Sequence, residues 1–197
     1  MRVTIFCLLA SLLFASVTRA QAPAEVPVFV IPAAASTIKF NVKASVAIEG
    51  TFDRWDATLR FASRNVTTGV LNIKVQADSV DTGSSIKNSK LKGGDFFDVS
   101  QNPLITFKST KIIQTGPNTF DVDGDFTIRG VTKAERLTLT VLGKGTGSGY
   151  INGTMAFDRK DYGMNSSIPF IRIANRVEVI VSLKAKRVSG PPVAFKQ

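Results

Sequence analysis

Apolar and polar residues alternate singly through most of this chain, and this alternation restricts the fold more than any other feature. In the clearest run, residues 120–128, Phe, Val, Gly, Phe and Ile alternate with Asp, Asp, Asp and Thr. A period of two places apolar residues on one face of a strand and polar residues on the other. Similar runs recur along the chain, separated by short segments rich in glycine, asparagine and serine. The pattern predicts an all-β barrel or sandwich of antiparallel strands.

Two segments depart from this period. Residues 84–93 have the spacing of a short helix, with Asp81 or Ser84 as a candidate N-cap and Gly93-Gly94 as a stop. We therefore expect a single domain of about eight strands with one or two short helices. Pro191-Pro192 follows the last alternating run and indicates a loose tail over residues 189–197.

The first twenty residues are typical of a signal peptide. Arg2 precedes an apolar run at residues 5–17, and Thr18-Arg19-Ala20 places small residues where a signal peptidase reads them. The run is shorter than the roughly 18 apolar residues expected of a membrane-spanning helix. We expect cleavage after Ala20, an N-terminal segment at residues 21–28, and export to the periplasm or to the outside of the cell.

The residue types needed for most catalysis are scarce. The only cysteine, Cys7, lies inside the expected signal, and the chain contains no histidine. The usual base of a nucleophilic triad is therefore absent, as are soft metal ligands. Asp121, Asp123 and Asp125 share one strand face and form the best cation candidate, but pairing with basic residues on a neighbouring strand is the stronger interpretation. We predict no catalytic residue, no metal and no cofactor.

The charge balance favours anionic partners. The chain has 25 basic and 15 acidic residues, a net charge of +10, which suits lipid headgroups, phosphates or nucleic acid. The lysines are scattered singly through polar faces, so we do not expect nucleic-acid binding. An outer-membrane barrel is disfavoured too, because one Trp and two Tyr are too few for two aromatic girdles. We expect no stable membrane insertion.

Phenylalanine is the informative aromatic residue, with 14 in the whole chain. Rings without a polar group suit a dry interior, and for any single phenylalanine ordinary core packing is the simpler interpretation. A barrel of this size either fills with side chains or encloses a tunnel for a slender ligand. Small inward residues at Gly124, Gly153 and Ala57 leave room for a tunnel, but the residues alone do not decide between the two.

Three motifs carry a family resemblance. The first is Val80-Asp81-Thr82-Gly83 with Leu91–Val99 and Pro103–Ser109, the second is Gly124–Lys133, and the third is Asp158–Met164. In this order they resemble the YceI-like polyisoprenoid-binding family, whose members are similar to lipocalins. The resemblance covers about residues 29–188. It implies an extended antiparallel lipocalin-like barrel that holds a long isoprenoid chain, such as a polyprenyl phosphate or a quinone tail.

With this resemblance, the tunnel becomes the preferred interpretation of the apolar face. Its predicted wall consists of Phe40, Val42, Phe61, Ile73, Val75, Phe97, Phe107, Phe126, Ile128, Met155 and Phe157. The family often has histidines near the first strand and before the first motif's leucine, and this chain lacks them. Lys87, Lys90 and Lys92 lie there instead and are candidate headgroup ligands, although a solvated helix face is the stronger interpretation of this run.

The sequence therefore predicts an exported protein that holds one long-chain amphiphile in its barrel for transport or storage. Burial of the tail would drive binding, at about 0.8 kcal/mol for each enclosed CH₂ group. Two alternatives stay open at this point. One is an enzyme that acts on a lipid in the same barrel, and the other is a filled barrel that serves as an interaction scaffold.

Overall fold

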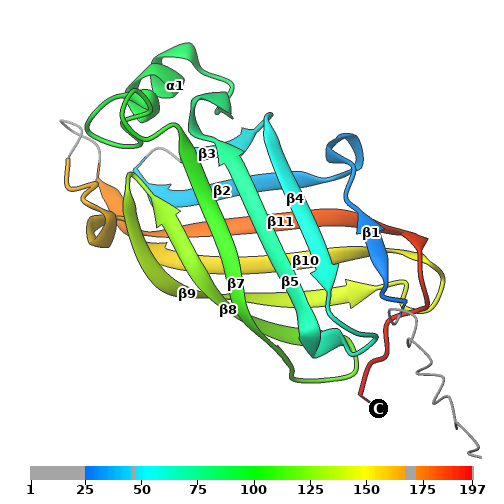
Figure 1. Ribbon diagram of the computed structural model, residues 1–197. Helices are drawn as coiled ribbons and strands as arrows, with labels where there is room; N and C mark the ends of the chain where they lie inside the picture. The colour runs from blue at the N-terminus through cyan, green and yellow to red at the C-terminus, as the bar shows by residue number, and fades with distance from the viewer. Residues whose placement is uncertain (1–24, 46–47, 167–171, 197) are drawn as a thin grey trace, which may run out of the picture.

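Eight antiparallel strands close into one barrel in the computed structural model, which describes residues 25–45, 48–166 and 172–196 (Figure 1). In order around the ring they are β1 (Val28–Val30), β4 (Trp55–Phe61), β5 (Gly69–Gln76), β7 (Leu104–Gln114), β8 (Thr119–Ile128), β9 (Val131–Leu142), β10 (Ser148–Asp158) and β11 (Ile173–Ser189). The short strand β1 closes the ring because it pairs with β4 on one side and β11 on the other. The predicted all-β antiparallel barrel is confirmed.

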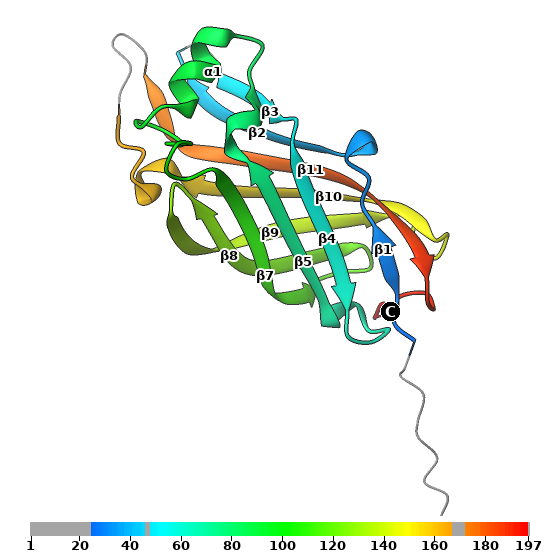
Figure 2. The same ribbon diagram turned by 45° about the horizontal axis from the view of Figure 1, so that its top comes forward.

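The longest strand, β11, has two successive partners along one edge. Its last residues pair with β1, and residues 173–182 pair with β2 (Thr37–Ala44). The 3-10 turn η1 (Ala33–Ala35) separates β1 from β2. Strand β3 (Ile48–Phe52) pairs with β2, and β6 (Val80–Asp81) pairs with β3, so these three strands extend the wall at one end of the barrel (Figure 2).

The alternation of the sequence becomes the inside and the outside of this barrel. In β8, Phe120, Val122, Phe126 and Ile128 are each at most 5% exposed, whereas the intervening polar residues reach solvent. The same pattern holds in β2 and β5. Burial of this continuous apolar face is the main force that stabilises the chain, because the described residues contain no cysteine that could crosslink them.

The predicted helix is α1 (Ser85–Lys92), which lies over one end of the barrel (Figure 1). The Ser84 side chain accepts a hydrogen bond from the backbone N–H of Lys87, and Gly93 follows the last turn. Asn88 anchors the helix, because its amide donates to Asp81 and its carbonyl oxygen accepts from Thr82. Within the described ranges, no helix is long and apolar enough to cross a membrane.

Three short 3-10 turns complete the described structure: η2 (Val66–Thr68), η3 (Ala77–Ser79) and η4 (Arg159–Tyr162). The expected signal peptide, residues 1–20, lies outside the described residues.

The expectation of a loose C-terminal tail is wrong for residues 190–196. Ala194 exchanges backbone hydrogen bonds with Arg64 and Val66, at 2.7 and 3.0 Å. The Gln114 amide bonds both the N–H and the carbonyl oxygen of Lys196, each at 2.8 Å. The Phe195 ring packs on Phe120, and backbone groups near Asn65 pair with Ala194. Burial of the ring and pairing of these backbone groups hold the tail on the barrel.

Candidate functional site

A cavity of about 100 Å³ lies inside the barrel at the end that α1 covers. Of the 24 residues that line it, 22 are apolar, and the two polar ones are Thr106 and Arg159. The wall combines side chains from β2, β3, β5 and β7–β11 with residues of α1, of the loop that follows it, and of η4 and the segment after η4. An apolar wall with one charged group suits a ligand that is a hydrocarbon over most of its length.

Ten of the eleven residues predicted for the tunnel lie on this wall: Phe40, Val42, Ile73, Val75, Phe97, Phe107, Phe126, Ile128, Met155 and Phe157. Sequence reasoning missed twelve further apolar residues: Ile38, Ile48, Phe52, Leu91, Phe96, Ile105, Leu137, Met164, Ile173, Val177, Val179 and Val181. Most of them belong to the same alternating runs, so the pattern contained them. Leu91 lies in α1 and Phe96 and Met164 lie in loops, where the period of two of a strand gives no signal.

Phe61 does not belong to this cavity. Its ring packs on Phe29, with centroids 5.8 Å apart, in a second cavity of about 110 Å³ at the opposite end of the barrel. Phe61 is the last residue of β4, and the strand's inward side chains there face the other end. The C-terminal tail, through Val193 and Phe195, forms part of this second wall.

The two cavities have no lining residue in common, so the barrel interior is not one continuous tunnel. Leu71, Val122, Leu139 and Leu183 lie between them and line neither cavity. On β9, for example, Leu139 follows Leu137 of the first cavity and precedes Val141 of the second. Packed side chains therefore close the inner end of the first cavity, and we call this cavity the cup.

The small inward residues do not leave the room that the sequence suggested. A Cβ atom added to Gly124 would lie 2.6 Å from Cζ of Phe107 and 2.7 Å from the backbone oxygen of Lys108. At Gly153 the space is taken by Leu139 and Val181, at 2.4 and 2.9 Å. Neighbouring side chains fold over each glycine, so these positions pack the wall tightly. Ala57 is buried and lines neither cavity.

Three phenylalanine rings close the cup beneath α1. Phe97 lies 6.4 Å from Phe40 and 6.0 Å from Phe52, and Phe40 lies 5.6 Å from Phe52, measured between ring centroids. The backbone N–H of Phe97 donates to the carbonyl oxygen of Leu91 at 2.9 Å, which ties the loop to the helix. Leu91, Phe96 and Phe97 therefore form an apolar plug that descends from the connecting segment into the barrel.

The three family motifs, far apart in the sequence, meet at this mouth. Arg129 and Gly130 form the tight turn between β8 and β9, with φ of +52° and +72°, as a type I′ turn requires. Nη1 of Arg129 donates to the carbonyl oxygen of Gly163 at 3.1 Å and to that of Phe96 at 3.4 Å. Ser166 donates to Asp95 at 2.9 Å. The second motif thus holds the other two together.

Arg159 is the charged group of the cavity and is only 6% exposed. Its Nε donates to the carbonyl oxygen of Ala174 at 3.2 Å, and Nη1 donates to those of Met164 and Ser166, the latter at 3.1 Å. Among the described residues, no carboxylate forms an ion pair with it. A buried guanidinium that is held by carbonyl groups alone keeps its full positive charge beside the ligand space. The third motif contained this residue, although the sequence did not single it out.

Tyr162 supports the wall from behind. It is fully buried, and its ring packs edge-on against Phe126 and Phe157, with centroids 5.5 and 5.1 Å away. Its hydroxyl donates to a carboxylate oxygen of Glu135 at 2.8 Å. Burial and this hydrogen bond to a carboxylate raise the pKa of Tyr162 well above its ordinary value, so the group stays neutral.

The lysines proposed for the headgroup do not line the cavity. Lys90 forms an ion pair with Asp95, and this bond, together with the one from Ser166, holds the pKa of Asp95 below its ordinary value. Lys87 and Lys92 lie on the same helix, outside the wall. On the barrel's outer surface, Arg136 of β9 pairs with Asp121 and Asp123, the latter at 2.7 Å. Among the described residues, no cluster of three or more potential metal ligands occurs.

An eight-stranded antiparallel barrel with an apolar cavity and a helical cover defines a lipocalin-like barrel protein. The family model for the YceI-like domain matches residues 29–185, and the chain belongs to this family.

Curated relatives and solved structures agree with this assignment. A UPF0312 protein of Pseudomonas savastanoi pv. phaseolicola is 33% identical over 127 residues, which is 62% of this chain and 66% of that protein, just under two thirds of its length. The structure of BcnA from Burkholderia cenocepacia superposes with a TM-score of 0.71 at 24% identity, over 78% of this chain and 98% of that one. A polyisoprenoid binding domain from Saccharophagus degradans gives a TM-score of 0.65 at 16% identity, over 82% and 99%. These structures share the fold.

Proposed function

We propose that this protein is an exported carrier that holds the hydrocarbon tail of an isoprenoid amphiphile in the cup beneath α1. The observation that carries the proposal is the composition of the wall, with 22 apolar residues and a single buried cation, Arg159. The polyisoprenoid-binding neighbour from Saccharophagus degradans supports the same class of ligand. We infer transport or storage, after removal of residues 1–20 and in the periplasm or outside the cell.

Tail burial supplies the affinity. Each CH₂ group that leaves water for the dry cup contributes about 0.8 kcal/mol, so one five-carbon unit contributes several kcal/mol before the entropy lost on binding. The cup of about 100 Å³ is comparable to cavities that hold one aromatic ring or a few methylene groups. A longer tail therefore requires the plug of Leu91, Phe96 and Phe97 to move outward.

Arg159 provides the polar end of the proposed site. Because its Nε and Nη1 are fixed by carbonyl groups, its orientation toward the cup is set before a ligand arrives. A phosphate, or the carbonyl oxygen of a quinone, would accept a hydrogen bond from such a group. This assignment replaces the lysines of α1, because Lys90 already pairs with Asp95.

The test has two parts. Mass spectrometry of lipid extracted from the protein purified from its native host should identify an isoprenoid in a fixed ratio to the protein. In a binding assay, Arg159→Gln should weaken the binding of a polyprenyl phosphate roughly tenfold more than the binding of the polyprenol of equal length. The reason is that a hydrogen bond to a charged group contributes about 1.5–3 kcal/mol. Lys160→Gln, an exposed neighbour with the same charge change, is the matched control.

Equal losses for the phosphate and the alcohol would remove Arg159 from the headgroup site. A protein purified without lipid that binds neither probe would favour the filled scaffold. Turnover of a bound lipid by the purified protein would favour the alternative of an enzyme.

A further inference from the structure

The surplus of positive charge is concentrated at the end of the barrel opposite α1, because that end has few acidic residues. That end consists of residues 25–30, 58–70, 141–151 and 183–196, which include β1 and the tail. These ranges contain seven basic residues and one acidic residue, Glu25. In contrast, residues 78–98, which include α1, contain four acidic and three basic residues. The surplus of positive charge is therefore uneven along the barrel axis.

Among the described residues, none of these seven basic side chains forms an ion pair with a carboxylate. Arg64 and Arg187 donate to the carbonyl groups of Pro192 and Gly190. Lys184 lies over the ring of Tyr150, with Nζ 5.9 Å from its centroid. These three charges are held in place without being neutralised by a carboxylate.

Exposed apolar side chains share this end. Of the nine large hydrophobic residues that are exposed among the described ones, six lie here: Val28, Val30, Val70, Leu142, Tyr150 and Val188. Each is between 39% and 52% exposed. Single exposed apolar residues are ordinary on a surface, but a group of six at one end of a barrel is not.

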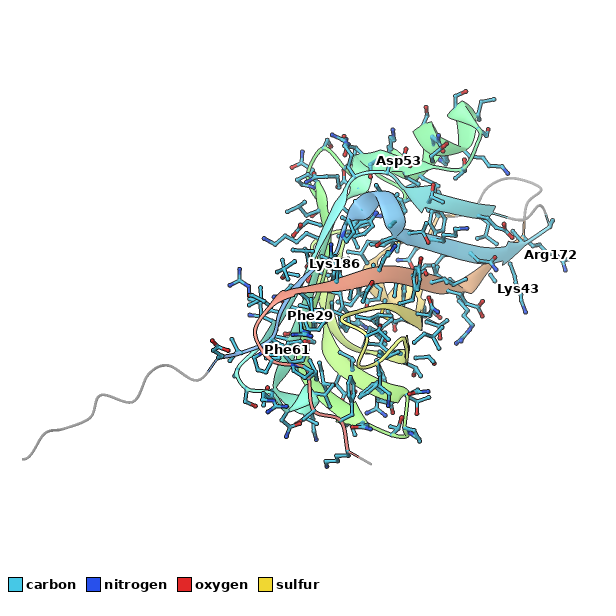
Figure 3. The ribbon with its side chains drawn as sticks, turned by 90° about the vertical axis from the view of Figure 1, so that its right-hand side faces the viewer. Phe29, Lys43, Asp53, Phe61, Arg172 and Lys186 are labelled. Atoms are coloured by element: carbon cyan, nitrogen blue, oxygen red, sulfur yellow. The ribbon has the colours of Figure 1, made fainter. Side chains whose placement is uncertain are left out.

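The strand register joins these residues into one outer surface. In one cross-strand row, Leu142, Tyr150 and Lys184 lie opposite one another on β9, β10 and β11. A second row joins Lys186 to Val30, and a third joins Val28 to Arg60 and then Val70. We call this surface, formed by the three rows and Val188, the β1 patch. In Figure 3 the labelled Lys186 lies near Phe29 and Phe61, away from Lys43 and Arg172 at the other end.

We propose that the β1 patch docks the barrel onto an anionic lipid bilayer. Valine and leucine side chains would enter the headgroup boundary, Tyr150 would lie at the interface, and Arg60, Lys184 and Lys186 would contact anionic headgroups. A surface that combines unneutralised basic groups with exposed aliphatic groups fits this partner. A single-stranded nucleic acid would call for stacking aromatic rings, and Tyr150 is the only aromatic residue in the patch. The docked barrel would turn its α1 mouth away from the membrane.

Vesicle co-sedimentation tests the proposal with the mature, full-length chain. We expect it to bind vesicles of phosphatidylcholine and phosphatidylglycerol and to bind pure phosphatidylcholine weakly. The double variant Lys184→Gln/Lys186→Gln should weaken partitioning roughly tenfold or more, because each basic group near such a surface contributes about a factor of five. High salt should produce a comparable loss. Circular dichroism checks that the variant is folded.

The matched control is Lys39→Gln/Lys43→Gln, which makes the same change of charge on exposed residues of β2, at the other end of the barrel. It should change partitioning by less than about twofold on the same scale. Equal losses in the two double variants would overturn the proposal, and so would equal binding to neutral and anionic vesicles. Tight, salt-sensitive binding of duplex DNA without binding to anionic vesicles would reassign the patch to a nucleic acid.

Discussion

Arg129 and Gly163 are joined by a hydrogen bond of 3.1 Å between a guanidinium nitrogen and a backbone carbonyl, across 34 residues of sequence. The same nitrogen reaches Phe96, so one side chain links the β8–β9 turn to the cover of the cup and to the segment after η4. Among the described residues, no other side chain forms hydrogen bonds that join all three family motifs. The mouth therefore depends on this residue more than on the lysines of α1.

Replacing Arg129 by Asn should loosen the mouth while preserving the turn, because asparagine tolerates positive φ. We expect the unfolding free energy to fall by about 1.5–3 kcal/mol, the usual contribution of a hydrogen bond to a charged group. Hydrogen exchange of residues 91–99 should accelerate more than exchange of β9 and β10. Arg60→Asn, on the outer surface of β4, is the control. Unchanged exchange at residues 91–99 would show that Arg129 does not hold the plug.

The Gly153 position tests whether the wall is tightly packed. Gly153→Ala should lower the unfolding free energy by about 1–3 kcal/mol, because the new methyl group would meet Leu139 and Val181. Adding Leu139→Val should restore part of the loss, since the removed methylene makes room for the added one. The two changes should therefore couple in a double-mutant cycle measured by urea denaturation.

Gly94→Ala is the matched control, because a Cβ atom there would meet no atom within 4 Å. Additive effects of Gly153→Ala and Leu139→Val would contradict the contact between them.

Stability at high pH should depend on Tyr162. Because burial and Glu135 raise its pKa in the folded state, folding binds this proton more tightly than the unfolded chain does. The stability that this proton contributes is fully present below the pKa of about 10 that tyrosine has in the unfolded chain. It is lost as the pH rises further. The unfolding free energy should therefore decline above about pH 10, and Tyr162→Phe should flatten part of that decline.

The chain has only two tyrosines, which gives a direct measurement. In Tyr150→Phe the sole tyrosine is Tyr162, and its tyrosinate absorbance should develop only as the protein unfolds. Ionisation of Tyr162 in the folded protein at pH 10 would contradict the burial argument.

Much of the fold follows from local pattern. Strand interiors such as Phe120–Ile128 could be predicted because one face of each strand is dry, and the helix could be predicted because Ser84 and Gly93 bracket it. The branching of β11 could not, since a strand's period does not reveal which two neighbours it has. The bound tail was missed for the same reason: its hydrogen bonds go to Gln114 and Arg64, far away in sequence.

The site was less accessible to sequence reasoning than the fold. Alternation identifies inward residues but not the depth at which each lies, so it assigned Phe61 to a tunnel that is in fact two separate cavities. It also treated glycine as empty space, whereas the ring of Phe107 covers Gly124. Alternation could not identify Arg159, because buried charged residues do not recur with a period along a strand. Only the contacts with Ala174 and Ser166 show its role in the wall.

Phe97 should control the size of the cup. It is 7% exposed and contacts the rings of Phe40 and Phe52, so Phe97→Ala should lower the unfolding free energy by about 3 kcal/mol and enlarge the cavity. If the plug limits the ligand space, the variant should bind a bulky apolar probe such as N-phenyl-1-naphthylamine several-fold more tightly than the parent protein. Fluorescence titration measures this directly, and Phe97→Leu provides a milder change if the alanine variant is unstable.

Phe120→Ala is the matched control, because Phe120 is equally buried but does not line the cup. It should destabilise the barrel to a similar degree without improving the affinity for the probe. A gain of affinity in Phe120→Ala as large as in Phe97→Ala would mean that general loosening, and not removal of the plug, admits the ligand. Unchanged affinity in Phe97→Ala would place the entrance away from the segment that follows α1.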